Sequence, residues 1–183
     1  CIIGHSGCGK TTVLNVLAGL EAPSAGHVFY RGKDMTKMTG AEKKQLRREV
    51  QPIFQDPFAA YNPFYKVDHV LQMPIQHFNL ASSKLEASTL IHNSLELVGL
   101  RPAETLGRYP HQLSGGQRQR IMVARALLLN PKIILADEPV SMVDASLRAT
   151  ILESLMKVKR ELGISLLYIT HDLTTAYQIS DYI

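Results

Sequence analysis

The stretch Gly4-His5-Ser6-Gly7-Cys8-Gly9-Lys10-Thr11-Thr12 decides the fold of this chain. It matches the phosphate-loop pattern, in which the second of two spaced glycines is followed by Lys and then Ser or Thr. The apolar run Cys1-Ile2-Ile3 precedes the loop and predicts a buried strand, and the run from Val13 to Gly19 predicts a helix. A strand, a glycine-rich loop and a helix in this order predict an α/β protein that binds a phosphate group.

The chemistry of the loop favours a nucleotide as its ligand. Its glycines allow positive φ and a close approach of the backbone, so that N–H groups and the positive end of the new helix can converge on phosphate oxygens. Lys10 adds a point charge for the β- and γ-phosphates, and Thr11 offers a hydroxyl to Mg²⁺. A glycine-rich turn with a surface lysine is the alternative for the loop alone. The candidate nucleotide-binding residues are Gly4, His5, Ser6, Gly7, Cys8, Gly9, Lys10, Thr11 and Thr12.

Length and charge limit the partners of the chain. Its 183 residues can bury one core, and no apolar run approaches the roughly 20 residues that cross a bilayer, so a membrane role would come through a partner. The net charge is +4, but the basic residues are scattered and aromatic residues are sparse, so we expect no nucleic-acid partner. Cys1 and Cys8 suggest neither a disulfide framework nor a metal site, which favours a reducing, cytoplasmic setting.

The sequence pattern changes near residue 56, from one that includes strands to one that predicts helices alone, and local signals predict the elements on both sides. Before it we expect a strand at residues 27–30, a turn at 31–34, a helix at 39–48 with the capping-box pair Thr39 and Glu42, and a strand at 50–54 that delivers Gln55. After it, prolines 57, 63 and 74 break the chain, and helices are expected at 67–78 and from the cap at Ser83 to Gly99, without a strand.

Alternation of strands and helices resumes after about residue 126, which predicts a parallel sheet covered by helices. We therefore expect a single domain over residues 1–183, with an α/β core at 1–55 and 127–183 and an inserted helical subdomain at 56–126. A new strand is expected to begin at residues 181–183. Because the chain also opens inside a strand, we expect a fragment of a longer polypeptide.

Two acidic residues end a predicted buried strand. Asp137 and Glu138 follow Ile133-Ile134-Leu135-Ala136, and ligands bind at this edge of a parallel α/β sheet. We expect Asp137 to hold Mg²⁺, usually through water, and Glu138 to accept a proton from the attacking water or orient it. A pair of solvated acids is the alternative.

A second anion-type site is predicted at Leu113-Ser114-Gly115-Gly116-Gln117. Ser114 is placed to cap the following helix, and Gly115 and Gly116 leave the N–H groups of its first turn accessible. One nucleotide has one terminal phosphate, so the surplus site suggests either two ligands or a site completed across two chains. A simple loop and cap is the alternative.

His171 and Gln55 have roles that the sequence leaves open, whereas the helix after Asp144 is assigned to the core. His171 ends the predicted strand 164–170 and could donate to a γ-phosphate or serve as a structural residue, and Asp172 caps the next helix. Gln55 could reach the metal or water, or form a turn. The helix after Asp144 places Leu147, Ile151, Leu155, Val158 and Leu162 on one face, which predicts core packing.

The order of these motifs resembles the ATP-binding subunit of ABC transporters over nearly the whole chain. The phosphate loop is followed by Phe54-Gln55-Asp56-Pro57, residues 113–117, Asp137-Glu138-Pro139, Ser141-Met142-Val143-Asp144 and Thr170-His171-Asp172. Tyr109-Pro110-His111-Gln112 and Gln117-Arg118-Gln119-Arg120 look most like the importers of peptides, oligopeptides and nickel chelates. His5 and Cys8 depart from the commoner Glu and Ser, and the adenine-stacking aromatic residue of the family would lie upstream of Cys1.

This resemblance implies an ATPase that binds ATP and Mg²⁺ and powers a membrane importer. Two such domains would close head to tail, so that Ser114, Gly115, Gly116 and Gln117 of one chain face the nucleotide held by the other. By the same likeness, Asp144 links the two sites, His171 senses the γ-phosphate, and Gln55 reports nucleotide state to the helical subdomain.

The implied partners are a second ATPase subunit, permease subunits and, indirectly, a solute-binding protein. Residues 56–65 would help to form the groove for a cytoplasmic helix of the permease, which places the chain at the cytoplasmic face of the membrane. One alternative is a soluble ABC-type ATPase that acts on nucleic acid or ribosomes, and another is a nucleotide-binding module without turnover.

Overall fold

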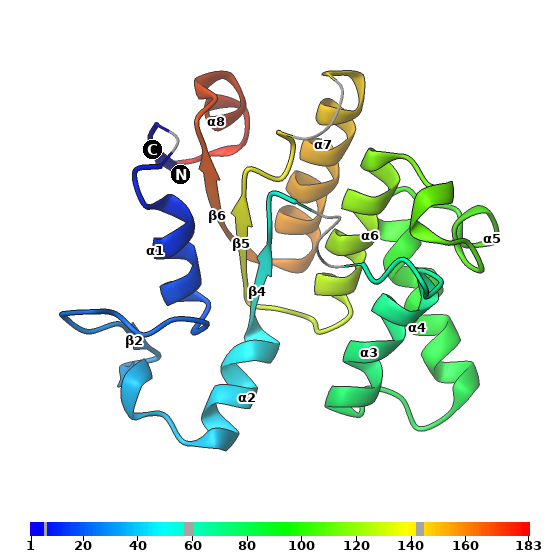
Figure 1. Cartoon of the computed structure of the whole chain (residues 1–183), viewed down its shortest axis with the longest axis horizontal. Helices are drawn as coiled ribbons and strands as arrows, with labels where there is room; N and C mark the ends of the chain where they lie inside the picture. The colour runs from blue at the N-terminus through cyan, green and yellow to red at the C-terminus, as the bar shows by residue number, and fades with distance from the viewer. Residues whose placement is uncertain (6, 57–60, 142–144) are drawn as a thin grey trace.

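The computed structural model describes residues 1–5, 7–56, 61–141 and 145–183. Four strands form a parallel sheet in the order β1-β6-β5-β4 (Figure 1). Their bounds are β1 Ile2–Ile3, β4 Val50–Ile53, β5 Ile133–Asp137 and β6 Ser165–Thr170. β1 is half-buried, not fully buried as the sequence predicted, because it lies at an edge of the sheet. β4 forms the other edge, which accommodates Pro52, since a strand with one neighbour loses no ladder bond on its open side.

Side chains alternate between the two faces of the sheet. On one face, Leu135 and Ile169 pack with α1 (Lys10–Leu17) and with Leu46 of α2 (Gly40–Glu49). On the other, Ile134 and Tyr168 pack with α6 (Gly115–Leu127) and α7 (Ala145–Leu162). Figure 1 shows α1 on one side of the strands and α6 and α7 on the opposite side. The period of two therefore fixes which strand residues can reach the phosphate loop.

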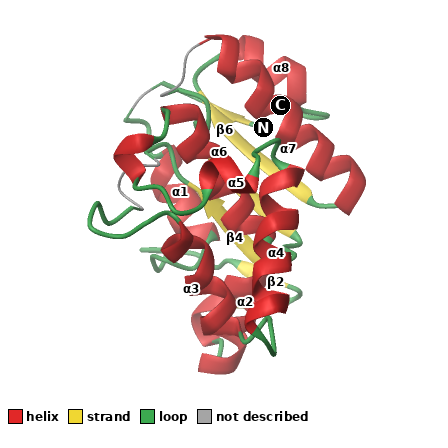
Figure 2. Ribbon diagram, turned by 90° about the vertical axis from the view of Figure 1, so that its right-hand side faces the viewer, coloured by secondary structure: helices red, strands yellow, loops and turns green. Residues whose placement is uncertain are grey.

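The described segment from residue 61 to the end of α6 contains helices joined by loops and no strand. It contains α3 (Asp68–Phe78), α4 (Lys84–Leu97), α5 (Pro102–Thr105), a 3₁₀ turn at Pro110–Gln112, and α6. Figure 2 shows α3, α4 and α5 gathered in front of the sheet. Leu71 of α3 and Leu95 of α4 are fully buried in the same apolar cluster as the sheet residue Ile134, so these helices and the sheet share one core.

Local signals placed most elements correctly and missed some boundaries. The capping box of α2 forms as expected, and Ser114, Ser83 and Asp172 cap α6, α4 and α8 (Leu173–Ile179) as predicted. Gln117 completes a capping box at α6 that was not predicted. The turn expected at 31–34 is confined to Arg31 and Gly32, which have φ of 51° and 75°, because β2 (Phe29–Tyr30) and β3 (Lys33–Asp34) pair on either side of it. A two-residue turn with both φ positive matches the twist of a hairpin. The first strand is therefore shorter than the predicted 27–30, and a second strand that the sequence did not predict follows the turn.

Three other expectations are corrected. Pro74 lies inside α3 instead of interrupting the chain, and residues 181–183 form no strand. Ile151, Leu155 and Val158 of α7 are buried as predicted, but Leu162 is 43% exposed because it is the last residue of the helix. The side chain of Leu147 and the residues Ser6, Pro57 and Asp144 lie outside the described part of the structure.

Candidate active site

The phosphate loop curls around the ammonium group of Lys10. Gly7 and Gly9 have φ of 81° and 95°, a conformation that strains any side chain with a Cβ. The positive φ angles of these two glycines let the loop turn directly into α1, whose first residue is Lys10. Lys10 is only 8% exposed, and its Nζ donates to the carbonyl oxygens of Gly4 and His5 at 2.8 and 2.9 Å. Oxygen acceptors of a bound phosphate would compete for these same donor positions.

The first turn of α1 contacts the end of β5. Thr11 Oγ1 donates to Asp137 Oδ2 at 2.7 Å, although the two residues are 126 positions apart in the sequence. Asp137 has the same parity as Leu135, so it faces α1 by the alternation of the strand. A hydroxyl and a carboxylate are oxygen ligands of the kind that Mg²⁺ accepts, directly or through water. The predicted pair of metal-binding residues is therefore brought together at one point.

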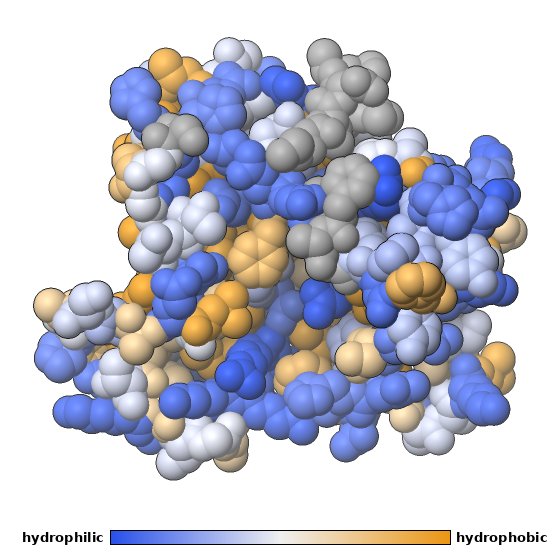
Figure 3. Space-filling view, viewed as in Figure 1, coloured by the Kyte–Doolittle hydropathy of each residue, from blue (hydrophilic) through white to orange (hydrophobic). Residues whose placement is uncertain are grey.

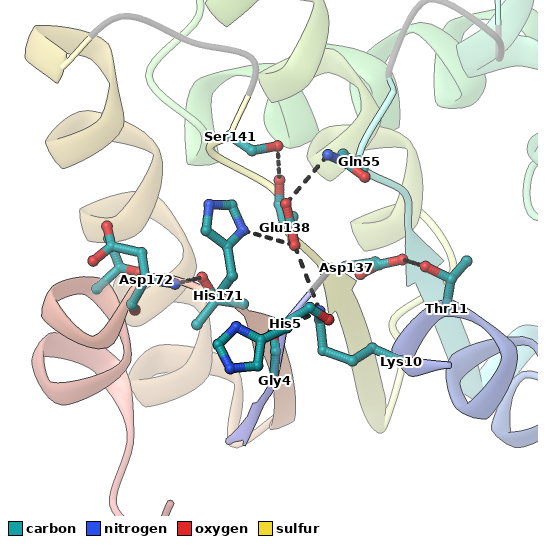
Figure 4. A network of polar contacts seen from close by, with 12 residues as sticks. Gly4, His5, Lys10, Thr11, Gln55, Asp137, Glu138, Ser141, His171 and Asp172 are labelled. Carbon is teal, nitrogen blue, oxygen red and sulfur yellow. Dashed lines mark hydrogen bonds and ion pairs between the residues drawn. The ribbon is translucent and has the colours of Figure 1, made fainter. Parts of the chain in front are cut away.

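Glu138 lies at the centre of a network that joins three strand ends (Figure 4). Its backbone N–H donates to the carbonyl of Ile169 at 2.8 Å, which ties the end of β5 to β6. The carboxylate accepts from Gln55 Nε2 at 3.2 Å and lies 2.8 Å from His171 Nδ1 and 4.0 Å from Lys10 Nζ. When Glu138 is ionised, the contact with His171 requires a proton on Nδ1 of the imidazole.

This environment suits a carboxylate that handles a water molecule. The Glu138 side chain is 9% exposed, and its oxygens are oriented by an imidazole and an amide from neighbouring strands. A carboxylate that is fixed in this way can accept a proton or orient a nucleophile close to a bound phosphate. The backbone of Glu138 has φ of 44°, an uncommon conformation for a residue with a side chain, and such outliers persist where the surroundings impose them.

The sequence did not foresee the partners of Glu138. Gln55 was expected to reach a metal or water, yet the structure places its amide on the Glu138 carboxylate. The pairing of Glu138 with His171 was also missed, and so was the hydrogen bond from Ser141 Oγ to the Glu138 carbonyl at 2.9 Å. The pairing with His171 depends on β5 and β6 being neighbours, which no local pattern shows. A βαβ pattern between residues 133 and 170 could have suggested that adjacency.

Residues 114–117 form a capping box, away from this network. Ser114 Oγ accepts from Gln117 N at 3.2 Å, and Gln117 Oε1 accepts from Ser114 N at 2.9 Å. Ser114 is exposed, and Gly115 and Gly116 open the first turn of α6. Because α6 and α1 cover opposite faces of the sheet, the two glycine-bearing helix starts belong to different sides of the domain. Ser6 and Asp144 are not described, and the side chains of His5, Cys8 and Thr12 are exposed.

Comparison with known proteins places this arrangement in a family. The sequence profile of the ABC transporter family matches residues 1–141. The chain belongs to this family. It is 41% identical over 180 residues to the dipeptide transport ATP-binding protein DppF of Escherichia coli K12, covering 98% of this chain and 53% of that protein. It is 42% identical to the putative oligopeptide transport ATP-binding protein YkfD of Bacillus subtilis 168, covering 98% and 54%.

Solved structures agree with this assignment. The ATP-binding cassette MJ0796, in a dimeric post-hydrolysis state with ADP and Pi, superposes with a TM-score of 0.83 at 31% identity, covering 95% of this chain and 75% of that chain. CbiO1 of Clostridium perfringens, part of the ABC transporter complex cbiONQ, gives 0.82 at 26% identity, covering 98% and 69%. The expected family and the α/β phosphate-loop fold are therefore confirmed. The chain spans about half the length of the curated relatives it matches.

Proposed function

We propose that this chain is the nucleotide-binding part of a subunit that hydrolyses ATP to power an importer of peptides or related small solutes. The observation that supports the proposal most directly is a set of contacts at the end of β5: Thr11 bonds to Asp137, and the adjacent Glu138 lies against both His171 and Lys10. The relatives that the chain resembles include dipeptide and oligopeptide transport ATP-binding proteins.

Each residue of the pocket has a proposed role. The loop N–H groups and Lys10 bind the β- and γ-phosphates, and Thr11 and Asp137 hold Mg²⁺, which neutralises charge on the phosphate oxygens when bound. Glu138 orients the attacking water and accepts its proton. His171 and Gln55 fix the Glu138 carboxylate in place, so that little reorganisation is needed during the reaction. In this proposal Gln55 acts through Glu138 as well as toward the metal or water.

We further propose that two copies of this domain, identical or paralogous, close head to tail around the nucleotide. In a single chain the capped start of α6 and the phosphate loop lie on different sides of the sheet. Ser114 to Gln117 would then face the γ-phosphate bound by the partner chain, with Asp144 in the loop that links the two sites. A dimeric cassette among the structural relatives supports this arrangement.

The described residues form an apolar groove that we propose as the docking surface for the permease. A cleft of about 350 Å³ is lined by residues of α2, β4, α3 and α6, together with Ala18 and Leu20 just after α1. Figure 3 shows hydrophobic side chains gathered in the hollow at the centre of the view. Phe54 and Met73 are 40% and 50% exposed there, beside Arg47 and the partly buried Arg125. We propose that a cytoplasmic helix of the permease docks in this groove, whose lining residue Phe54 lies close in the sequence to the expected contact segment 56–65.

This surface would hold the chain at the cytoplasmic face of the membrane as a peripheral subunit. In the described residues no helix is both long and apolar enough to span a bilayer. We propose that nucleotide-dependent movement passes from Glu138 to Gln55, which follows β4, and then to the groove that β4 also lines. We also propose that residues 56–126 form the helical subdomain that moves against the core at 1–55 and 127–183.

The experiment is to express the full-length protein with the permease subunits encoded beside it, and to measure ATP hydrolysis and solute uptake in vesicles. Met73→Glu places a charge in the groove and should abolish co-purification and uptake, while ATP hydrolysis by the separate subunit continues. Leu85→Glu is the matched control, because Leu85 is 79% exposed on α4 and does not line the groove. Wild-type protein without ATP hydrolysis, or uptake that survives Met73→Glu, would contradict the proposal.

A further inference from the structure

His171 has little side-chain packing to fix its orientation. Its side chain is 57% exposed, and it borders a cleft of about 380 Å³ that Ser141, Arg148 and Asp172 also line. The contact with Glu138 is the polar contact that the structure gives to its ring among the described residues. The imidazole therefore depends on the backbone around it for its position.

That backbone is the corner between β6 and α8, and Asp172 organises it. Asp172 N donates to Thr170 Oγ1 at 3.0 Å, and Asp172 Oδ1 accepts from Thr174 N at 2.9 Å as the cap of α8. The backbone carbonyl of Asp172 accepts from Thr175 Oγ1 at 3.0 Å. All of these bonds lie within five residues of His171, so they shape the corner without anchoring it to another element.

Arg148 supplies the anchor from a different helix. Its NH1 lies 3.4 Å from Asp172 Oδ2, the carboxylate oxygen that the cap does not use. Among the described residues, Asp172 is the one polar partner that the structure gives to the Arg148 guanidinium, whose Nε is buried without a hydrogen bond. Arg148 stands in α7, which is held in the core by Ile151 and Leu155. The ion pair thus connects the corner that carries His171 to a firmly packed helix (Figure 4 shows Asp172 beside His171).

We propose that Arg148 is a positioning residue for the ATPase reaction, which acts through Asp172 to hold His171 against Glu138. The proposal rests on the proposed function, because it assigns no activity of its own. Its direct effect should be on turnover, since the polar partner that the structure gives to Arg148 is Asp172, outside the phosphate loop. A small displacement of an orienting group reduces the rate of the chemical step while leaving ground-state binding intact.

The test is a double-mutant cycle in the full-length protein, with ATP turnover and nucleotide affinity measured separately. Arg148→Gln should lower kcat about fivefold, the upper range for an ion pair of this exposure, with nucleotide affinity unchanged. Asp172→Asn should have a similar effect, because asparagine still caps α8 but cannot form the ion pair. If Arg148 acts through Asp172, the double variant should be no worse than either single variant.

Two controls separate positioning from general destabilisation. Arg160→Gln removes an exposed arginine from the same helix, where Arg160 bonds to its own helix carbonyl, and should leave kcat and the melting temperature unchanged. Arg148→Lys restores a cation and should return kcat to within about twofold of wild type.

The inference is overturned if Arg148→Gln keeps wild-type kcat, if the double variant loses about 25-fold as two independent effects would, or if nucleotide affinity falls in parallel with kcat. A loss of kcat that follows the melting temperature and that Arg148→Lys does not rescue would equally refute it. Wild-type protein without ATP hydrolysis would instead refute the proposed function, so the two failures are distinguishable.

Discussion

Replacing Glu138 by glutamine removes one charge from the site and almost no volume. The amide oxygen can still accept from His171 Nδ1, and the side chain of Gln55 can turn its amide to meet the new NH₂ group, so the contacts at 2.8 and 3.2 Å can be kept. What is lost is the ability to accept a proton. A positioned base contributes about 10²–10⁴-fold, so the barrier should rise by about 3–5 kcal/mol.

Nucleotide affinity should rise or stay constant in this variant, although the turnover rate falls. Glu138 Oε1 lies 4.0 Å from Lys10 Nζ, and both side chains are at least 91% buried, so removing the carboxylate also removes a negative charge beside the bound phosphates. The assay is steady-state phosphate release by the full-length protein, paired with titration of a fluorescent ATP analogue. Glu153→Gln is the control, since Glu153 is exposed on α7. Turnover by Glu138→Gln within tenfold of wild type, or a matching loss of affinity, would refute the assigned role.

The other predictions concern binding and stability. Lys10→Ala should weaken ATP binding at least about tenfold, by loss of a buried charge at the phosphates, and equilibrium titration measures it. Leu95→Ala should cost about 2–5 kcal/mol of unfolding free energy in urea, because Leu95 is fully buried in the shared core. Ser114→Ala should cost about 1 kcal/mol in the same assay through loss of the α6 cap. Hydrogen bonds lower the pKa of Asp34 (from Thr36) and of Glu42 (from Lys33) to about 2. The stability that these two carboxylates contribute is complete above about pH 4.5 and is lost as pH falls toward 2. The melting temperature of Glu42→Gln, measured against pH, should therefore fall less steeply in acid than that of the wild type.

The sequence predicted those parts of the fold that are encoded within a few residues. Thr39 and Glu42 form the predicted capping box, and Ser114 caps α6 as predicted, because the partners of each cap lie in one helical turn. Parity along β5 was enough to separate Asp137 from Glu138. The β2–β3 hairpin was misjudged, because Arg31 adopts a positive φ that its side chain does not predict.

The contacts that complete the site join residues that lie far apart in the sequence. Glu138 meets His171 because β6 lies between β1 and β5 in the sheet, and Arg148 meets Asp172 because α7 packs beside the end of β6. Both depend on the order of strands and the packing of helices, which arise from burial of the whole core. The motifs therefore identify the residues of the site, but the contacts between Glu138 and His171 and between Arg148 and Asp172 can be seen only in the folded structure.

The most direct measurement is a structure of the full-length Glu138→Gln protein with ATP and Mg²⁺. We expect the γ-phosphate within hydrogen-bond distance of Lys10 Nζ, the metal between the phosphates and Thr11, and Ser114 of a second copy closing the pocket. A nucleotide bound elsewhere, or no nucleotide at saturating ATP, would contradict this expectation.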